Sequence, residues 1–109
     1  MDMKSVIQAG IDYIEENLRS EIGAHELARN AGFSLYHYYR LFQAATGFPV
    51  MQFILRRRLL HAAYKISLGA QGVDTALEYG FDTYAGFYRA FRREYGMTVS
   101  EYIDMGFAK

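Results

Sequence analysis

The feature that most constrains the fold of this chain is an internal repeat. An alanine followed four residues later by Gly-Phe occurs twice, 48 residues apart, as Ala28, Gly32 and Phe33 and then as Ala76, Gly80 and Phe81. Beyond Gly-Phe the offset is 49, and the matched residues are Arg40, Phe42, Gly47, Phe53 and Ile54, then Arg89, Phe91, Gly96, Tyr102 and Ile103. A short helix, a tight turn and a second helix produce this spacing, which is typical of a helix-turn-helix. Two copies in 109 residues are much less expected by chance than one.

The periodicity of apolar residues predicts an all-α fold, because they recur at helical spacing nearly everywhere and no stretch alternates as a strand does. We predict seven helices, at about 3–19, 24–31, 35–46, 49–67, 73–79, 84–95 and 98–105. The expected organisation is a single domain over residues 1–109, with subdomain one at about 3–47, a connecting helix at about 49–67 and subdomain two at about 73–105. Duplicated helical hairpins are also a way to build a simple bundle, which is the alternative to a helix-turn-helix function.

Several residues are suited to begin or end these helices. Gly32 favours the left-handed conformation that ends a helix, and Ser34 can cap the next helix by accepting a backbone N–H. Asp82 or Thr83 can cap the corresponding helix of the second copy. Pro49, the only proline, stands where the first turn of the long helix tolerates it.

Composition excludes several classes of protein. There is no cysteine, and the three histidines, His25, His37 and His61, show no metal-ligand spacing, so we expect neither a metal nor a cofactor. No glycine-rich phosphate loop is present, and the acidic residues lie mainly on solvent-facing positions of the first two helices, so an enzyme is not expected. The N-terminus is not a signal peptide and charges interrupt every apolar stretch, which predicts a soluble cytoplasmic protein without a membrane span.

The formal net charge of zero weakens the case for nucleic-acid binding, but the charges are unevenly distributed. Residues 32–70 carry five basic and no acidic side chains, and residues 83–97 carry three basic and one acidic. Residues 1–31 and 71–82 carry most of the acidic side chains. Basic potential can therefore be concentrated on particular surfaces of a neutral chain.

The first copy of the repeat contains the run LARNAGFS at 27–34, and the second contains the runs ALEYGF at 76–81 and FYRAFRR at 87–93. With these runs the chain resembles, from about Ile7 to Tyr102, the DNA-binding domain of the AraC/XylS family of bacterial transcription regulators, and the runs of the second copy are the more diagnostic. The resemblance implies two helix-turn-helix subdomains joined by one long helix, with helices 35–46 and 84–95 entering neighbouring major-groove segments. The chain departs from the family pattern at Val99, where a proline is usual, and at Ile103, where an arginine is usual, so we expect the last helix to start less sharply.

The family also implies partners. Double-stranded DNA is the expected ligand, RNA polymerase is a further expected partner, and no membrane is involved. Family members usually carry a second domain for effector sensing or dimerisation, so we expect either a minimal stand-alone regulator or a DNA-binding domain whose partner domain lies outside this chain.

Helical periodicity separates the two faces of each predicted recognition helix. The expected core residues are Leu35, Tyr38, Leu41, Phe42 and Ala45 in the first helix, and Phe87, Ala90 and Phe91 in the second. The base-reading candidates are Tyr36, Tyr39, Arg40, Gln43, Tyr84, Ala85, Tyr88 and Arg89, of which Tyr36, Tyr39 and Arg40 occupy base-contacting positions by family resemblance. The phosphate-contacting candidates are Ser34, His37, Arg58, Thr83, Arg92 and Arg93.

Some of these assignments leave alternatives open. Arg40 and Arg89 can bind guanine through two hydrogen bonds or contact a phosphate. The run Arg56-Arg57-Arg58 cannot face one way, since successive helical residues turn by about 100°, so we expect one or two phosphate contacts and otherwise a solvated face, with a structural ion pair as the alternative for Arg58. A helical module that binds another protein competes with DNA binding, whereas RNA is disfavoured because the A-form major groove is too narrow for a helix.

Overall fold

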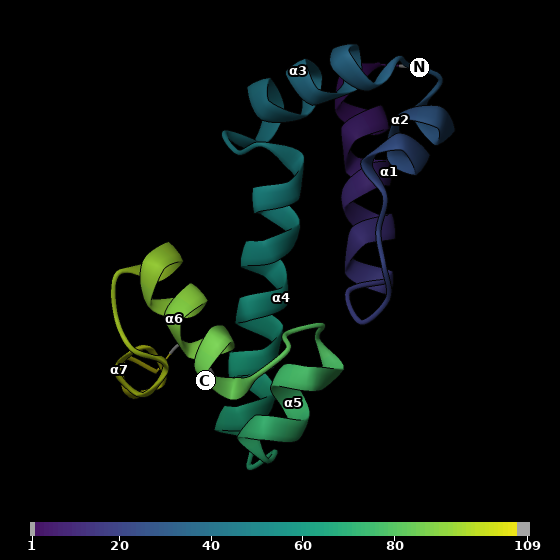
Figure 1. The fold of residues 1–109 in the computed structure, drawn as a ribbon. Coiled ribbons are helices and arrows are strands. Elements are labelled where there is room, and N and C mark those ends of the chain that lie inside the picture. The colour runs from purple at the N-terminus through teal and green to yellow at the C-terminus, as the bar shows by residue number, and fades with distance from the viewer. Residues whose placement is uncertain (1, 107–109) are drawn as a thin grey trace. The chain divides into compact units, whose positions relative to one another are not determined.

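The computed structural model describes residues 2–106, and these form seven helices and no strand, which confirms the predicted all-α fold (Figure 1). The helices are α1 (Met3–Glu16), α2 (Ala24–Ala31), α3 (Leu35–Thr46), α4 (Val50–Ser67), α5 (Gly72–Glu78), α6 (Tyr84–Tyr95) and α7 (Val99–Asp104). The chain divides into two compact units, one ending at Leu55 and the other beginning at Arg56, so residues of α4 belong to both.

The two copies of the repeat form the same local structure. Ser34 accepts the backbone N–H of His37 at 3.2 Å, which caps α3, and Thr83 accepts that of Gly86 at 2.9 Å, which caps α6. Of the two residues that could cap α6, Asp82 and Thr83, the structure therefore uses Thr83. Gly32 and Gly80, in the turns that precede these caps, have φ angles of 80° and 91°, a conformation that favours glycine.

The core of the first unit lies where α3 packs against α1 and α2. Tyr38 and Phe42 project from α3 and are completely buried, as is Ile14 of α1. The Phe42 ring meets the edge of Phe53, at a centroid distance of 5.2 Å, and thereby contacts the first part of α4. Helical periodicity predicts Ala45 in the core, but it is exposed. It lies at the edge of the apolar face of α3, where no neighbouring helix covers it.

The core of the second unit is aromatic. Phe87 and Phe91 of α6 are completely buried and Ala90 is nearly so, as predicted. The Phe91 ring lies 4.9 Å from that of Tyr95 and 5.5 Å from that of Tyr102, centroid to centroid. Leu59, Ala62 and Ala63 of α4 are also completely buried in this unit. Aromatic pairs at these distances add about 0.5–1.5 kcal/mol each beyond the area they bury.

Three predicted boundaries need correction. The first helix ends at Glu16 rather than near residue 19, and the long helix begins at Val50. Pro49 lies just before that helix, and its carbonyl accepts the Phe53 N–H at 2.9 Å. The start of the last helix is well defined, because Thr98 and Glu101 form a reciprocal capping box that satisfies two backbone N–H groups.

Candidate nucleic-acid interface

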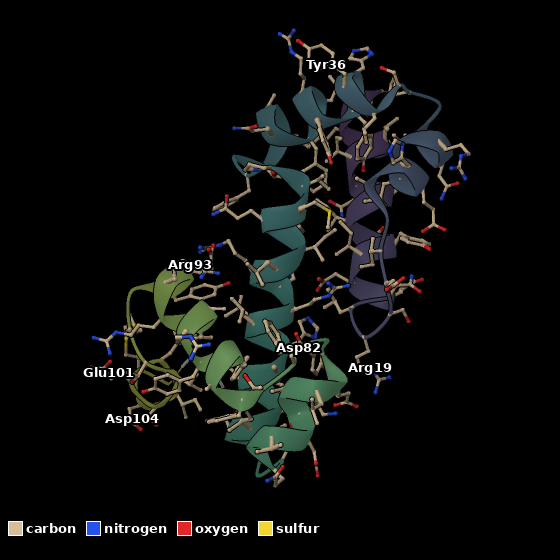
Figure 2. All side chains as sticks on the ribbon, in the orientation of Figure 1. Arg19, Tyr36, Asp82, Arg93, Glu101 and Asp104 are labelled. Atoms are coloured by element: carbon tan, nitrogen blue, oxygen red, sulfur yellow. The ribbon has the colours of Figure 1, made fainter. Side chains whose placement is uncertain are left out.

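The outward face of α3 carries the five side chains that periodicity placed there. Each of them is exposed to solvent: Tyr36, His37, Tyr39, Arg40 and Gln43. Tyr36 is 70% exposed, and it points away from the helix into open space (Figure 2). Because a tyrosine this exposed contributes little to a core, it is available to a ligand. Residues 32–70 carry no acidic side chain, so none opposes an anion from within this helix.

Arg40 and Tyr36 are paired on this face. The Arg40 guanidinium lies over the Tyr36 ring, 5.6 Å from its centroid, and Nη1 donates to the Tyr36 hydroxyl at 3.3 Å. At an exposed site such a contact contributes only about 0.5–1 kcal/mol. It nevertheless holds a cation and an aromatic ring side by side on one turn of the helix.

The outward face of α6 is more basic and less aromatic than that of α3. Ala85, Arg89, Arg92 and Arg93 are exposed, whereas Tyr84 and Tyr88 are half-buried. Tyr84 packs against Phe87, with ring centroids 5.8 Å apart. A Cβ added at Gly72 would lie 2.7 Å from the Tyr84 ring, so the ring occupies the space that a side chain there would need. Tyr84 therefore has a structural role in addition to any contact with DNA.

The repeat places equivalent residues at equivalent helical positions. Arg40 and Arg89 are each the sixth residue of their helix, and both are exposed. Tyr36 is the second residue of α3, and its counterpart in α6 is Ala85. An alanine can offer only apolar contact where the tyrosine offers a ring and a hydroxyl. The two faces can therefore recognise different surfaces.

The hydroxyl-bearing candidates stand at the start of each helix. Ser34 and Thr83 are exposed, and each hydroxyl oxygen accepts a backbone N–H, which leaves its own hydrogen to donate outward. The His37 ring lies edge-on to Phe33, with centroids 5.0 Å apart. These side chains surround the N-termini of α3 and α6, where free backbone N–H groups attract anions.

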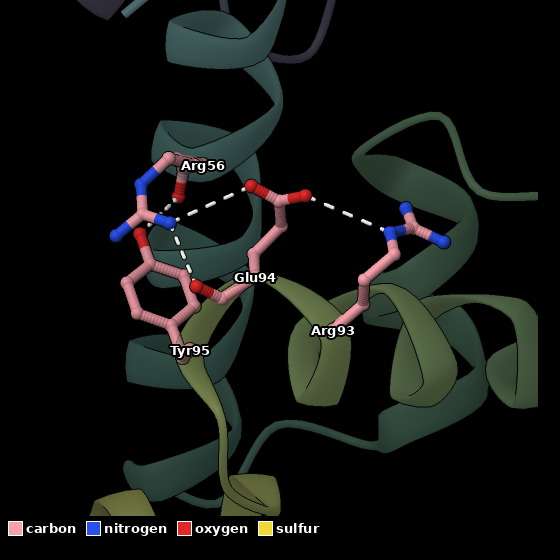
Figure 3. Close-up of polar contacts among 4 residues, drawn as sticks. All are labelled: Arg56, Arg93, Glu94 and Tyr95. Carbon is pink, nitrogen blue, oxygen red and sulfur yellow. Dashed lines mark hydrogen bonds and ion pairs between the residues drawn. The ribbon is translucent and has the colours of Figure 1, made fainter. Parts of the chain in front are cut away.

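Arg56 has a structural role that the sequence pattern did not show. Its Nη1 donates to the Glu94 carbonyl at 2.7 Å and lies 3.5 Å from Glu94 Oε1 (Figure 3). The guanidinium stacks over Tyr95, 4.3 Å from the ring centroid, and the Tyr95 hydroxyl donates to the Arg56 carbonyl at 2.9 Å. The partners lie 38 and 39 residues away in the sequence, so no local pattern could reveal them.

The other two arginines of the run are also half-buried, so the solvated face expected there is not found. Arg57 Nη2 lies 3.3 Å from His61 Nε2. Burial lowers the pKa of Arg58, which remains charged near neutral pH because arginine starts so far above it. A phosphate contact by Arg58 stays a prediction.

Within residues 2–106, no group of three or more metal-ligating side chains comes together. The helices in this range include none with the length and apolarity needed to cross a bilayer.

Known sequences show similarity along most of the chain. A family model described as "Helix-turn-helix domain" matches residues 27–105. The transcriptional activator AarP of Providencia stuartii is 31% identical over 90% of this chain and 73% of its own length. The regulatory protein SoxS of Salmonella typhimurium is 30% identical over 94% of this chain and 96% of its own. The chain spans only 36% of the right origin-binding protein of Escherichia coli, to which it is 32% identical.

Solved structures show the same likeness. A probable AraC family transcriptional regulator from Rhodopseudomonas palustris has a TM-score of 0.77 and 30% identity, and the match covers 96% of this chain and 98% of that one. The DNA-binding domain of AdpA, solved in complex with a target DNA, has a TM-score of 0.73 over 91% of this chain and 90% of its own; at 22% identity it shows likeness of fold. With the matched model, the relatives and the duplicated helix-turn-helix in agreement, the chain belongs to the AraC-type helix-turn-helix family of transcription regulators.

Proposed function

We propose that this chain regulates transcription by binding duplex DNA with sequence preference, with the outward faces of α3 and α6 in the major groove. The observation that carries the proposal is the exposed face of α3, where an arginine, two tyrosines and a glutamine stand together in a segment without acidic residues. A major groove admits an α-helix, and arginine and glutamine are side chains that hydrogen-bond base edges there. Membership of a family of transcription regulators supports the same function.

Each exposed residue has a proposed role. Arg40 and Arg89 read bases through their guanidinium groups, Gln43 pairs with an adenine edge, and Tyr36 and Tyr39 contribute aromatic contact. In α6, the half-buried candidates Tyr84 and Tyr88 contribute less to base contacts, and Ala85 offers apolar contact with a thymine methyl. Cations and hydroxyls at the periphery bind phosphates, and these are Ser34, His37, Arg58, Thr83, Arg92 and Arg93.

The proposal is tested by selecting bound sequences from a pool of random duplexes. We expect a defined DNA motif to be enriched. The motif should contain at least one defined segment for each of the two helices, α3 and α6. A protein-interaction module built from the same helices would enrich no sequence. Absence of duplex binding at low salt would contradict the proposal.

Arg40→Ala is expected to relax the preference at one or two base positions and to weaken binding to the selected site by about 1–3 kcal/mol. The residue is exposed, so folding should not change. Competition titrations with single-base variants of the site measure the effect, and Arg19→Ala, at an exposed position after α1, is the matched control. If affinity falls equally on every sequence, Arg40 contacts a phosphate and the base-reading role is wrong.

We further propose that both helices contact one duplex, at two unlike half-sites in a fixed order. Adjacent major-groove segments on one face of B-DNA are about 34–36 Å apart. The connecting helix α4 has 18 residues and therefore spans about 27 Å before the width of the subdomains is added. Inserting five base pairs between the half-sites is expected to remove the second footprint, because it turns that half-site to the opposite face. Footprinting of the original and the lengthened site measures this, and two protected half-sites on the lengthened duplex would contradict it.

The proposed function is binding without catalysis, in the cytoplasm, where bacterial DNA lies. RNA polymerase is a proposed protein partner, since a regulator that activates transcription has to reach it. An effector or dimerisation domain outside this chain is proposed by analogy with longer relatives such as the right origin-binding protein, of which the chain spans 36%.

A further inference from the structure

The first unit contains a pocket behind its recognition helix. It encloses about 250 Å³, and the apolar side chains of Val6, Leu27 and Ala31 line it together with Gly10 and Tyr38. For comparison, a cavity of about 150 Å³ inside a protein accommodates benzene. The pocket is thus large enough for one six-membered ring with a short substituent. Val6 and Leu27 are buried, whereas Ala9 and Asn30, which also line it, are exposed, so the pocket runs from the surface into the core.

One of the side chains that line this pocket, Tyr38, carries a buried polar atom without a partner. The Tyr38 side chain is completely buried, and its hydroxyl makes no hydrogen bond. An unsatisfied buried polar group costs about 1–3 kcal/mol, so native proteins rarely keep one without a reason. The other tyrosine that lines the pocket differs, since the Tyr13 hydroxyl donates to Glu26 Oε1 at 2.8 Å.

Gly10 makes room for this hydroxyl. Glycine in the interior of a helix costs roughly 0.5–1 kcal/mol relative to alanine, and Gly10 lies in the middle of α1. A Cβ at this position would collide with the Tyr38 hydroxyl, so the glycine keeps the hydroxyl next to the pocket. Burial raises the pKa of Tyr38, and the group therefore stays protonated and available as a donor.

We propose that this pocket binds a small, neutral, single-ring aromatic compound that carries one hydrogen-bond acceptor, such as a carbonyl oxygen, which accepts from the Tyr38 hydroxyl. Apolar walls match the ring, and one buried donor matches one acceptor. A charged ligand is disfavoured because the residues that line the pocket, within the described part of the chain, include no lysine, arginine, histidine, aspartate or glutamate to serve as a counter-ion. Since Tyr38 belongs to α3, a ligand held here would stabilise the packing of the recognition helix on α1 and give the domain a point of chemical control separate from its DNA-binding face.

The test uses the whole chain without DNA, so its outcome does not depend on the proposed function. Acetophenone is titrated against ¹⁵N-labelled protein, with α-methylstyrene as a ligand of nearly identical shape in which a methylene group replaces the carbonyl oxygen. We expect saturable shifts at the amides of Ala9, Gly10 and Asn30 and none at Ser100 in the second unit. Acetophenone should bind about 3- to 10-fold more tightly, the range expected for one hydrogen bond.

Two variants assign the preference to one hydroxyl. Tyr38→Phe is expected to fold, because it removes an unpartnered group, and to bind both compounds with equal affinity. Tyr13→Phe, which removes a hydroxyl that is already paired, should keep the preference. The proposal is overturned if neither compound produces saturable shifts at the pocket, or if the preference for acetophenone is absent from the natural protein or persists in Tyr38→Phe.

Discussion

Phe42→Ala and Phe91→Ala are each expected to lower the free energy of unfolding by about 3–5 kcal/mol, the cost of emptying a well-packed aromatic site. Both side chains are completely buried, and each occupies the same place in its copy of the repeat. Phe42 packs on Tyr38 and Phe53, and Phe91 packs on three aromatic rings, those of Phe87, Tyr95 and Tyr102. A small domain has a total stability of only about 5–15 kcal/mol, so either change should partly unfold its unit.

Hydrogen exchange measured residue by residue distinguishes the two variants, because the chain consists of two compact units. Phe42→Ala should increase exchange first in α1 and α3, and Phe91→Ala first in α6 and α7. Tyr36→Ala and Leu77→Ala are the controls, since these side chains are 70% and 52% exposed in the first and second unit respectively. Thermal midpoints that do not move in either phenylalanine variant would show that the core faces of α3 and α6 are assigned wrongly.

DNA affinity is expected to fall by about 40-fold when the salt concentration rises from 50 to 200 mM. Three of the proposed phosphate contacts are arginines, namely Arg58, Arg92 and Arg93. If all three neutralise phosphate charge, the slope of log K against log salt is about −0.9 per contact, or roughly −2.7 in total. A protein-binding groove that relies on aromatic side chains would be nearly indifferent to salt.

The slope can be assigned to particular residues. Arg92→Ala should reduce its magnitude by about one, because one phosphate contact is lost. Arg93 Nε lies 3.6 Å from Glu94 Oε2, so part of its charge is already compensated and Arg93→Ala should change the slope less (Figure 3). Arg19→Ala should leave it unchanged. A slope near zero for the natural protein would contradict the assignment of this surface to nucleic acid.

Local sequence patterns determined the helices and most of their faces. The turn glycines, the caps at Ser34 and Thr83 and the 3.6-residue periodicity act within one or two turns of the backbone, so they can be recognised without knowing what packs against them. For the same reason the repeat identified Phe42 and Phe91 as core and the side chains around Arg40 as exposed, and the structure confirms both. The resemblance carried by those same residues led to the right family.

Tertiary structure decided what depends on contacts between distant segments. Ala45 lies at the edge of the apolar face of α3. Its burial depends on the neighbouring helices, and none of them covers it. Arg56 is held by Glu94 and Tyr95, and the Tyr38 hydroxyl lies beside Gly10, 28 residues earlier. A helical pattern specifies which way a side chain points but not what it meets, because the partner comes from another helix whose position the packing of the whole unit determines. The cation over the Tyr95 ring and the pocket behind α3 both arise at this level.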